Sequence, residues 1–396
     1  MSKLEQLISE LCPNGVEYRR LENCCKILDN KRKPVTKSAR KAGKYPYYGA
    51  NGIQDYVSNY IFDGTFILVG EDGSVVTEMG TPIVTWATGK IWVNNHAHII
   101  SEMNGVLLRY LFHYLQTVPV KHLIHGNIPK LTGGDFRALN IPVPPLPVQE
   151  EIVRILDKFT ELSAELTAEL TARKQQYEYY RDSILTYDES IKIELGQIAT
   201  VTKLAGFEFT KYVSYSDSGK VIALRGLNVK NGHLDLKDVK YIDNSDLSKL
   251  TRSKLHIGDM LFTYVGTIGQ VALVNEEDRF YLAPNVALIR TTTDKLMPKF
   301  MSYYFQSSQF WKTQIDRLLQ SSSMQNIPMG KIRKFKIPVP PLAEQQRIVD
   351  ILDRFDKLCN DISEGLPAEI EARQKQYEYY RDKLLTFKKK EAAENE

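Results

Sequence analysis

The heptapeptide QYEYYRD occupies Gln176–Asp182 and recurs unchanged at Gln376–Asp382. Three tyrosines in seven residues make a chance recurrence improbable. Longer matches surround it: IPVPPLPVQEEIVRILDKF (Ile141–Phe159) with IPVPPLAEQQRIVDILDRF (Ile337–Phe355), and RKQQYEYYRDSILTY (Arg173–Tyr187) with RQKQYEYYRDKLLTF (Arg373–Phe387). The chain therefore contains an internal duplication.

The two copies differ in length by four residues. The offset between them is 196 residues in the first block and 200 in the second, so the second copy carries the additional residues, near Gly365–Leu366–Pro367. Proline in a helix interior removes a hydrogen bond and clashes with the preceding turn. We therefore expect a kink or a break at Pro367.

Each copy opens with a Pro-rich extended stretch and then becomes strongly helix-forming. Apolar residues recur at spacings of three and four over about 40 residues, which predicts two long amphipathic helices, 146–187 and 341–388. The stripe residues in the first helix are Val148, Ile152, Ile155, Phe159, Leu162, Leu166, Leu170, Tyr177, Tyr180 and Ile184. Those in the second are Ile348, Ile351, Phe355, Leu358, Ile362, Leu366, Ile370, Tyr377, Tyr380 and Leu384.

An apolar stripe of this length needs a partner helix. The two predicted helices match in length, so we expect them to pair with each other as an antiparallel coiled coil, relating the halves by a pseudo-twofold axis. The alternatives are that each helix packs on its own domain, or that helices pair between two chains.

The remaining segments, 1–145 and 188–340, are rich in Tyr, Asn, Gly and β-branched residues. TFILVGEDGSVV (Thr65–Val76) and DMLFTYVGTIGQVALV (Asp259–Val274) predict strand–turn–strand units. KIWVNNHAHII (Lys90–Ile100) and RFYLAPNVALI (Arg279–Ile289) predict matched buried strands. The fold class is α+β, with two globular domains, two long helices and a charged tail at 389–396.

Bulk composition excludes several classes. At 396 residues the chain has room for two or more domains, and no run of about 18 apolar residues predicts a membrane span. The amphipathic start has no signal-peptide core. The four scattered cysteines, Cys12, Cys24, Cys25 and Cys359, do not form a disulfide framework. We therefore expect a reduced, cytoplasmic protein.

Catalytic signatures are absent from the sequence. It has no GxxxxGK(S/T), GxGxxG, GxSxG or Asn-Pro-Pro-aromatic motif, and its carboxylates form no obvious pair. His96 and His98 would face one side of a predicted strand, a possible metal pair, but no Cys or carboxylate lies nearby in the sequence. Core or surface histidines are the better interpretation, and binding rather than turnover is expected.

The charge is unevenly distributed. The net charge is +4, but residues 29–45 (DNKRKPVTKSARKAGKY) place seven Lys or Arg against one Asp. Such a run is either a solvated loop or a phosphate-binding loop.

Taken together, the Pro-rich lead-ins, the helix starts EEIVRILDKFT and EQQRIVDILDRFD, and the paired QYEYYRD resemble the helical regions of type I restriction–modification specificity subunits. SAELTAEL (Ser163–Leu170) looks like the tetrapeptide repeat of some members, and YYGANGIQDYV (Tyr47–Val57) resembles their target-recognition domains. The resemblance covers essentially the whole chain.

The resemblance implies a non-catalytic subunit in which each globular domain reads one half of a split, asymmetric site in double-stranded DNA. The helices set the spacer and dock methyltransferase subunits, expected to number two, and restriction/translocase subunits can join. No cofactor is expected in this chain; S-adenosylmethionine, ATP and Mg are expected on the partners. A self-contained DNA methyltransferase or nuclease and a coiled-coil adaptor that never meets DNA remain as alternatives.

Reading bases requires Arg, Lys, Asn or Gln at base edges, and phosphate contacts require Lys or Arg. The phosphate candidates in the first domain are Lys31, Arg32, Lys33, Lys37, Arg40, Lys41 and Lys44, and the base-reading candidates are Asn51, Gln54 and Lys130. The candidates in the second domain are Lys211, Arg225, Asn228, Lys230, Gln325 and Lys331. Tyr45, Tyr47 and Tyr48 could stack on an extruded base, although a core role is the better interpretation.

For partner docking, Arg181 and Arg381 are the candidates, on the exposed side of the helix pair. The alternative is that QYEYYRD only packs the helix ends.

Overall fold

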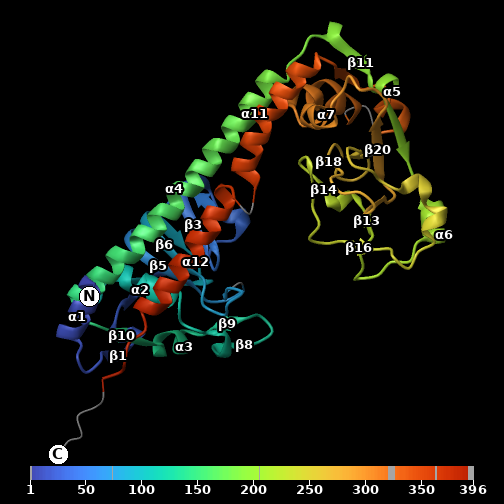
Figure 1. The fold of residues 1–396 in the computed structure, drawn as a ribbon. Coiled ribbons are helices and arrows are strands. Elements are labelled where there is room, and N and C mark those ends of the chain that lie inside the picture. Colours follow the sequence, from blue (N-terminus) through green and yellow to red (C-terminus); the bar gives the residue numbers. More distant parts are fainter. Residues whose placement is uncertain (1, 74, 205, 320–325, 362–363, 391–396) are drawn as a thin grey trace, which may run out of the picture. The chain divides into compact units, whose positions relative to one another are not determined.

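The computed structural model describes residues 2–73, 75–204, 206–319, 326–361 and 364–390 (Figure 1). Its contacts group into two compact units. Unit 1 comprises residues 1–167 and 369–396, and unit 2 comprises residues 168–368. No described helix combines the length and apolar character needed to cross a lipid bilayer.

Unit 1 is built on a six-stranded sheet in the order β2-β7-β5-β6-β3-β4, in which only the β3–β6 pairing is parallel. A separate antiparallel pair joins β1 to β10. The strands are β1 (Glu17–Arg20), β2 (Lys26–Ile27), β3 (Ala42–Gly49), β4 (Gly52–Val57), β5 (Phe62–Gly70), β6 (Val84–Val93), β7 (Ala97–Ser101), β8 (Ile124–His125), β9 (Lys130–Leu131) and β10 (Asn140–Val143). The helices are α1 (Lys3–Leu11), α2 (Leu108–Leu115), α3 (Gly133–Ala138), the first part of α4 (Leu146–Ile184) and α12 (Leu366–Leu384).

The central strand β5 divides the apolar residues of unit 1 into two clusters. Successive side chains of a strand point to opposite faces. Ile67 and Val69 pack with residues of α2, α4 and α12, whereas Phe66 and Leu68 pack in a second cluster formed by the sheet's other face. The helices therefore cover one face of this sheet.

Unit 2 contains a four-stranded sheet, β12-β20-β17-β18, a three-stranded sheet, β16-β13-β19, and the pairs β11–β21 and β14–β15. The strands are β11 (Lys192–Glu194), β12 (Ala199–Lys203), β13 (Ile222–Leu224), β14 (Val229–Lys230), β15 (His233–Leu234), β16 (Lys240–Tyr241), β17 (Met260–Thr263), β18 (Val271–Leu273), β19 (Phe280–Leu282), β20 (Val286–Thr291) and β21 (Lys336–Pro338). The helices are α5 (Leu195–Ile198), α6 (Gly206–Tyr212), α7 (Pro298–Phe305), α8 (Ser308–Phe310), α9 (Asp316–Leu319), α10 (Met329–Ile332) and α11 (Leu342–Asn360), with the second part of α4.

The predicted strand units are confirmed in part. The segment 259–274 forms the antiparallel hairpin β17–β18. Each of the segments 90–100 and 279–289 divides between two strands, because the sharp turns at 94–96 and 283–285 interrupt them. In 65–76 only the first strand, β5, forms a regular element.

The first long helix is confirmed and the second is broken. Helix α4 has 39 residues. The second copy forms two helices, since α11 ends at Asn360 and α12 begins at Leu366, so the predicted break is present. A Cβ on the buried Gly365 would lie 2.6 Å from the carbonyl oxygen of Lys357 and 2.7 Å from that of Asp361. The chain therefore needs glycine there, just before Pro367 enters the first turn of α12.

The Pro-rich lead-ins end in duplicated glutamines, Gln149 and Gln345, both fully buried. In each copy, Oε1 accepts the N–H of the residue just before α2 or α7, and Nε2 donates to a proline carbonyl of the lead-in. The distances are 2.9 and 2.7 Å for Gln149 and 2.8 and 2.7 Å for Gln345. The partners are Leu107 and Pro144 in unit 1 and Met297 and Pro340 in unit 2.

Each unit combines helical segments from both copies of the repeat. In unit 1 the start of α4 runs antiparallel to α12 (Figure 1). The ring of Phe159 stacks on that of Tyr380, with 5.3 Å between the centroids. In unit 2 the end of α4 runs antiparallel to α11, and Tyr180 stacks on Phe355 at 5.7 Å. Antiparallel pairing within the chain is therefore confirmed, with the first QYEYYRD in unit 2 and the second in unit 1.

A hydrogen-bonded group in unit 1 holds α2, α4 and α12 together. His113 is fully buried, its Nε2 lies 2.8 Å from Asp157 Oδ1, and its Nδ1 lies 3.0 Å from the Tyr377 hydroxyl. Burial lowers the pKa of His113 despite the hydrogen bond to Asp157. A neutral ring with the proton on Nε2 donates to the carboxylate and accepts from the tyrosine. In unit 2, Tyr303 donates directly to the corresponding Asp353.

Gly365→Ala should destabilise the chain, because its methyl group meets backbone carbonyls that cannot move without disturbing the end of α11. Overpacking of this kind costs about 1–3 kcal/mol. Gly330→Ala, in α10, is the matched control, since a Cβ there meets no atom within 4 Å. Urea denaturation of both variants measures the difference, and equal free energies of unfolding would contradict the close approach.

Candidate nucleic-acid interface

The basic segment of unit 1, residues 29–45, forms a loop and the start of β3 and carries five exposed lysines. In the described part of the chain none of the five makes an ion pair with an acidic side chain. Charges that are not neutralised within the protein remain available to phosphate. The five are Lys31, Lys33, Lys37, Lys41 and Lys44.

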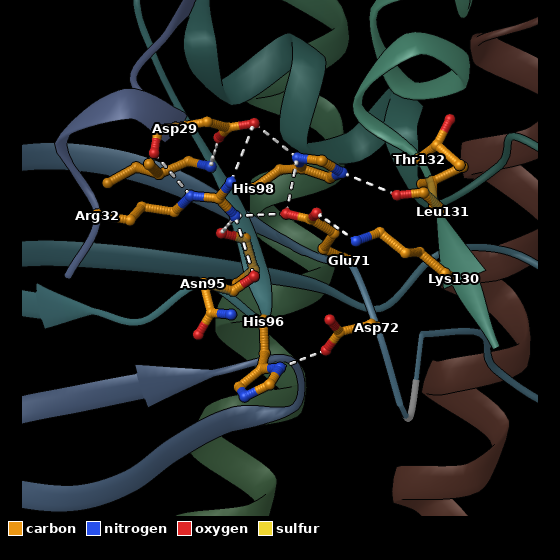
Figure 2. Close-up of polar contacts among 12 residues, drawn as sticks. Asp29, Arg32, Glu71, Asp72, Asn95, His96, His98, Lys130, Leu131 and Thr132 are labelled. Atoms are coloured by element: carbon orange, nitrogen blue, oxygen red, sulfur yellow. Dashed lines mark hydrogen bonds and ion pairs between the residues drawn. The ribbon is translucent and has the colours of Figure 1, made fainter. Parts of the chain in front are cut away.

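Arg32 differs from its neighbours in the loop, and its side chain is only 12% exposed. Figure 2 shows its guanidinium turned toward Glu71. Its Nη1 lies 2.5 Å from Glu71 Oε2 and 2.7 Å from the Ala97 carbonyl oxygen. Its Nε donates to the carbonyl of Asp29 at 2.9 Å. The prediction of a phosphate contact is therefore corrected for Arg32: this side chain fastens the loop to β5 and β7.

His98 lies at the centre of the same group and is 1% exposed. Its Nδ1 is 2.7 Å from Asp29 Oδ2 and its Nε2 is 3.1 Å from the Leu131 carbonyl oxygen (Figure 2). Its ring stacks on that of Phe136, with 4.2 Å between the ring centroids. Burial alone would raise the pKa of Asp29. The hydrogen bond and charge of His98, with Arg32 nearby, outweigh that effect and lower the pKa.

Asp29, Glu71 and His98 have their ligand-type atoms within 4.8 Å of one another, a spacing compatible with a metal. The carboxylates already face cations of the protein, because Arg32 contacts Glu71 at 2.5 Å and Lys130 contacts it at 3.2 Å. We therefore interpret this group as an internal ion-pair network.

His96 does not share a face with His98, so that prediction is wrong. Strand β7 begins at Ala97, and His96 precedes it in the turn, half exposed and in contact with Asp72. Both histidines have carboxylate partners that are distant in sequence.

Arg40 lies beside a small pocket. Its guanidinium carbon is 4.2 Å from the centroid of the Tyr47 ring, its Nε donates to the Val35 carbonyl at 3.1 Å, and Nη1 lies 3.3 Å from Asp55. The adjoining cavity, bordered by Tyr47 and Trp92, measures about 320 Å³. Arg40 is thus partly engaged within the protein.

The three tyrosines of β3 are mostly structural. Tyr47 and Tyr48 are 1% and 7% exposed, which confirms the core interpretation for both. Tyr45 is half-buried and its ring lies 5.1 Å from that of Tyr60.

The base-reading candidates of unit 1 lie on two elements. Asn51 is exposed in the β3–β4 turn and Gln54 is exposed in β4, where its Oε1 accepts from Asn94 Nδ2 at 3.3 Å. Lys130 is half exposed in β9 and its Nζ lies 3.2 Å from Glu71 Oε1.

In unit 2 two of the predicted candidates, Arg225 and Lys230, line a cleft of about 850 Å³. Arg225, Lys230 and Gln270 line it, together with Val265 and Asn285. Lys230 is 56% exposed and pairs with Asp235 at 2.7 Å, whereas Arg225 Nη2 lies 3.0 Å from Asp238 Oδ1.

Asn228 is fully buried beneath this cleft, so it cannot reach a base. Its Oδ1 accepts the Arg225 N–H at 3.1 Å and its Nδ2 donates to the carbonyls of Asp235 and Asp238 at 2.9 and 2.7 Å. The base-reading prediction is therefore corrected: Asn228 holds the 225–238 loop.

The other candidates of unit 2 lie apart from this loop. Lys211 is exposed in α6 with its Nζ 5.2 Å from the Tyr212 ring centroid, and Lys331 is exposed in α10. Gln325 lies outside the described residues.

The partner-binding candidates are not on an exposed side. The side chains of Arg181 and Arg381 are 15% and 9% exposed, each contacts the aspartate that follows it, and each guanidinium lies 5.6 Å from a buried tyrosine of its own motif. This correction favours the alternative that QYEYYRD packs the helix ends. Its middle tyrosines are the exposed ones, Tyr179 at 71% and Tyr379 at 61%.

Gln270 and Asn285 line the cleft and were missed by the sequence reasoning. The available signal was the glycine-rich VGTIGQV (Val265–Val271), which by itself indicates only a bend between strands. Asn285 adopts a positive φ of 71°. No pattern in the sequence predicted this conformation.

The helical scaffold is duplicated, whereas the surfaces of the two units differ. This organisation is that of a class of proteins with two recognition units. A family model, described as "Type I restriction modification DNA specificity domain", matches twice, over residues 13–173 and 187–372. The chain belongs to the specificity subunits of type I restriction–modification systems, the non-catalytic subunits that confer DNA specificity. A self-contained enzyme is not supported.

Relatives share most of the chain. A putative type I restriction enzyme specificity subunit of Haemophilus influenzae is 38% identical over 384 residues, covering 94% of this chain and 96% of the relative. An Escherichia coli type I restriction enzyme specificity subunit is 34% identical over 315 residues, or 74% of each chain.

Solved structures share the fold. The S subunit of a type I restriction–modification system from M. genitalium superposes with a TM-score of 0.56 at 14% identity, covering 94% of this chain and 96% of that one. A chain from a study of complex assembly in a type I system gives 0.54 at 15% identity, with coverage of 94% and 98%.

Arg32→Ala should lower the stability of the fold, whereas Lys31→Ala should weaken the contact with DNA phosphate. Removing Arg32 deletes its charged hydrogen bond to Glu71, which keeps Lys130 as a partner, and should cost about 1.5–3 kcal/mol of unfolding free energy. Removing the exposed Lys31 should change stability by less than about 0.5 kcal/mol but reduce the salt slope of duplex binding by about one. Denaturation and binding between about 50 and 200 mM salt measure both quantities. Weaker binding by Arg32→Ala without lost stability would contradict its internal role.

Proposed function

We propose that the two domains, 1–145 and 188–340, each read one half of a split, asymmetric site in double-stranded DNA. The observation that carries the proposal is the contrast between scaffold and surface. The scaffold is duplicated in detail, because Gln149 and Gln345 make equivalent hydrogen bonds in the two copies. The surfaces differ: the described part of unit 1 carries five exposed lysines without an acidic partner, whereas unit 2 has a cleft bordered by Arg225, Lys230 and Gln270. Equivalent helical scaffolds that carry different surfaces suit a protein that reads two different DNA sequences.

We further propose that α4 sets the unread gap between the half-sites. The helix continues without a break through Thr167 and Ala168, where the two units divide. Four residues change its length by about 6 Å and its rotation by about 40°, while one DNA base pair spans about 3.4 Å. A four-residue change therefore nearly preserves the apolar stripe and alters the spacing.

The proposed partners are two methyltransferase subunits, which carry S-adenosylmethionine, and restriction/translocase subunits, which carry ATP and Mg. We place the assembly in the cytoplasm, where bacterial DNA lies. Tyr179 and Tyr379 support paired docking, because each is a large exposed aromatic at the same position of a repeated motif. Aromatic side chains are enriched where protein surfaces meet.

Deleting Thr167–Leu170 should shorten the unread gap by about one to two base pairs, because it removes about 6 Å of helix against about 3.4 Å per base pair without rotating the stripe out of the seam. Mapping methylated adenines in a host that expresses the deletion complex measures the gap. Both half-sites should stay unchanged.

The matched control deletes only Thr167 and Ala168, which rotates the following stripe by about 200° and should abolish methylation. An unchanged gap in the four-residue deletion would overturn the spacer role. A parent motif without two separated halves would overturn the proposal itself.

Tyr179→Ala and Tyr379→Ala should each remove one of two equivalent docking sites. Each single variant should bind one methyltransferase subunit where the parent binds two, and the double variant should bind none. Native mass spectrometry counts the subunits, and Glu165→Ala, exposed on the same helix, is the control. Two bound subunits in every variant would place the docking surface elsewhere.

A further inference from the structure

We propose that the cleft of unit 2 reads bases through Gln270, whose amide donates to an acceptor on a base edge. The inference rests on the proposed function and adds the residue and the chemistry of one contact. Three segments, 225–231, 263–270 and 283–285, line the cleft. With a volume of about 850 Å³, it is large enough for a base edge and its backbone.

The segment that carries Gln270 is held in place by hydrogen bonds to Thr263 and by its close approach to Trp311. Thr263 Oγ1 donates to the Thr267 carbonyl at 2.5 Å and accepts the Gln270 N–H at 2.9 Å. Gly269 has φ +85°, and a Cβ there would lie 2.5 Å from the Trp311 ring. The loop is therefore pressed against the core while Val265, Gly266 and Thr267 stay exposed. A contact supported in this way is positioned before DNA arrives.

The orientation of the Gln270 amide is fixed by a backbone group. Its Oε1 accepts the Asn231 N–H at 3.0 Å. A backbone N–H can only donate, so the oxygen must face Asn231 and the Nε2 group must point away. Within the described residues, Nε2 has no hydrogen-bond partner, and the side chain is only half-buried.

This geometry restricts the base. With its oxygen engaged, Gln270 offers only donors, so it cannot make the two-sided contact that glutamine makes with adenine. It fits acceptors in the major groove: N7 or O6 of guanine, N7 of adenine, or O4 of thymine. Cytosine, which presents an amino donor there, is disfavoured.

The rest of the cleft fits a nucleic acid. Val265 and Leu227 are exposed apolar side chains at its border, 36% and 42%, which can contact a thymine methyl group. Lys230, 56% exposed, can turn from Asp235 to a phosphate. A small apolar ligand would not need these polar groups at the rim.

The experiment compares Gln270→Ala and Gln270→Glu in the assembled complex by mapping methylated adenines in the host genome. Gln270→Ala should broaden one base position in one half-site, leaving the other half-site and the gap unchanged. Gln270→Glu places an acceptor where the amide donated and should shift that position toward cytosine. Gln346→Ala, exposed on α11, is the control and should leave the motif intact.

If a variant methylates too little DNA to map, the same complex selects duplexes from a randomised pool, and the preferred motif is read there. An unchanged motif in Gln270→Ala would overturn the inference even where the parent motif is bipartite. A parent motif lacking two halves would instead overturn the proposed function, so the two failures are distinguishable.

Discussion

The structure depends on one constraint: α4 is one continuous helix that cannot fold back to cover its own apolar stripe. At about 1.5 Å per residue, its 39 residues extend nearly 60 Å. The start of the stripe is covered by α12 and the end by α11, both supplied by the second copy of the repeat. The hydrogen bond between His113 and Tyr377 illustrates the result, since it joins side chains 264 residues apart.

The duplication explains why the helices were predictable. Residues such as Ile152 and Ile348 occur twice in one pattern, and the periodicity defined α4 nearly to its ends. Pro367 and the added residues signalled the break between α11 and α12. Which half of each helix serves which unit was not predictable, because two identical QYEYYRD segments fit either position equally well by pattern.

The candidate interface was harder to predict, because charge in a sequence does not say where a side chain points. Lys31 and Arg32 are adjacent and equally positive, yet only the lysine is free of the buried carboxylate at Glu71. That carboxylate lies 39 residues further along the chain. Asn228 and Gln270 show the same limit. The side chain of Asn228 donates to backbone carbonyls, and that of Gln270 is oriented by the N–H of Asn231. Only the folded loops create these contacts.

The division of the chain also affects the order in which it can fold. Unit 2 is one continuous stretch, 168–368, whereas unit 1 lacks α12 until the residues that follow 368 have been made. Domains usually fold in the order in which they leave the ribosome. Here the later unit can finish first. The first must wait with the apolar side chains of Val148, Ile152 and Leu156 only partly covered, a nascent surface that chaperones are suited to protect.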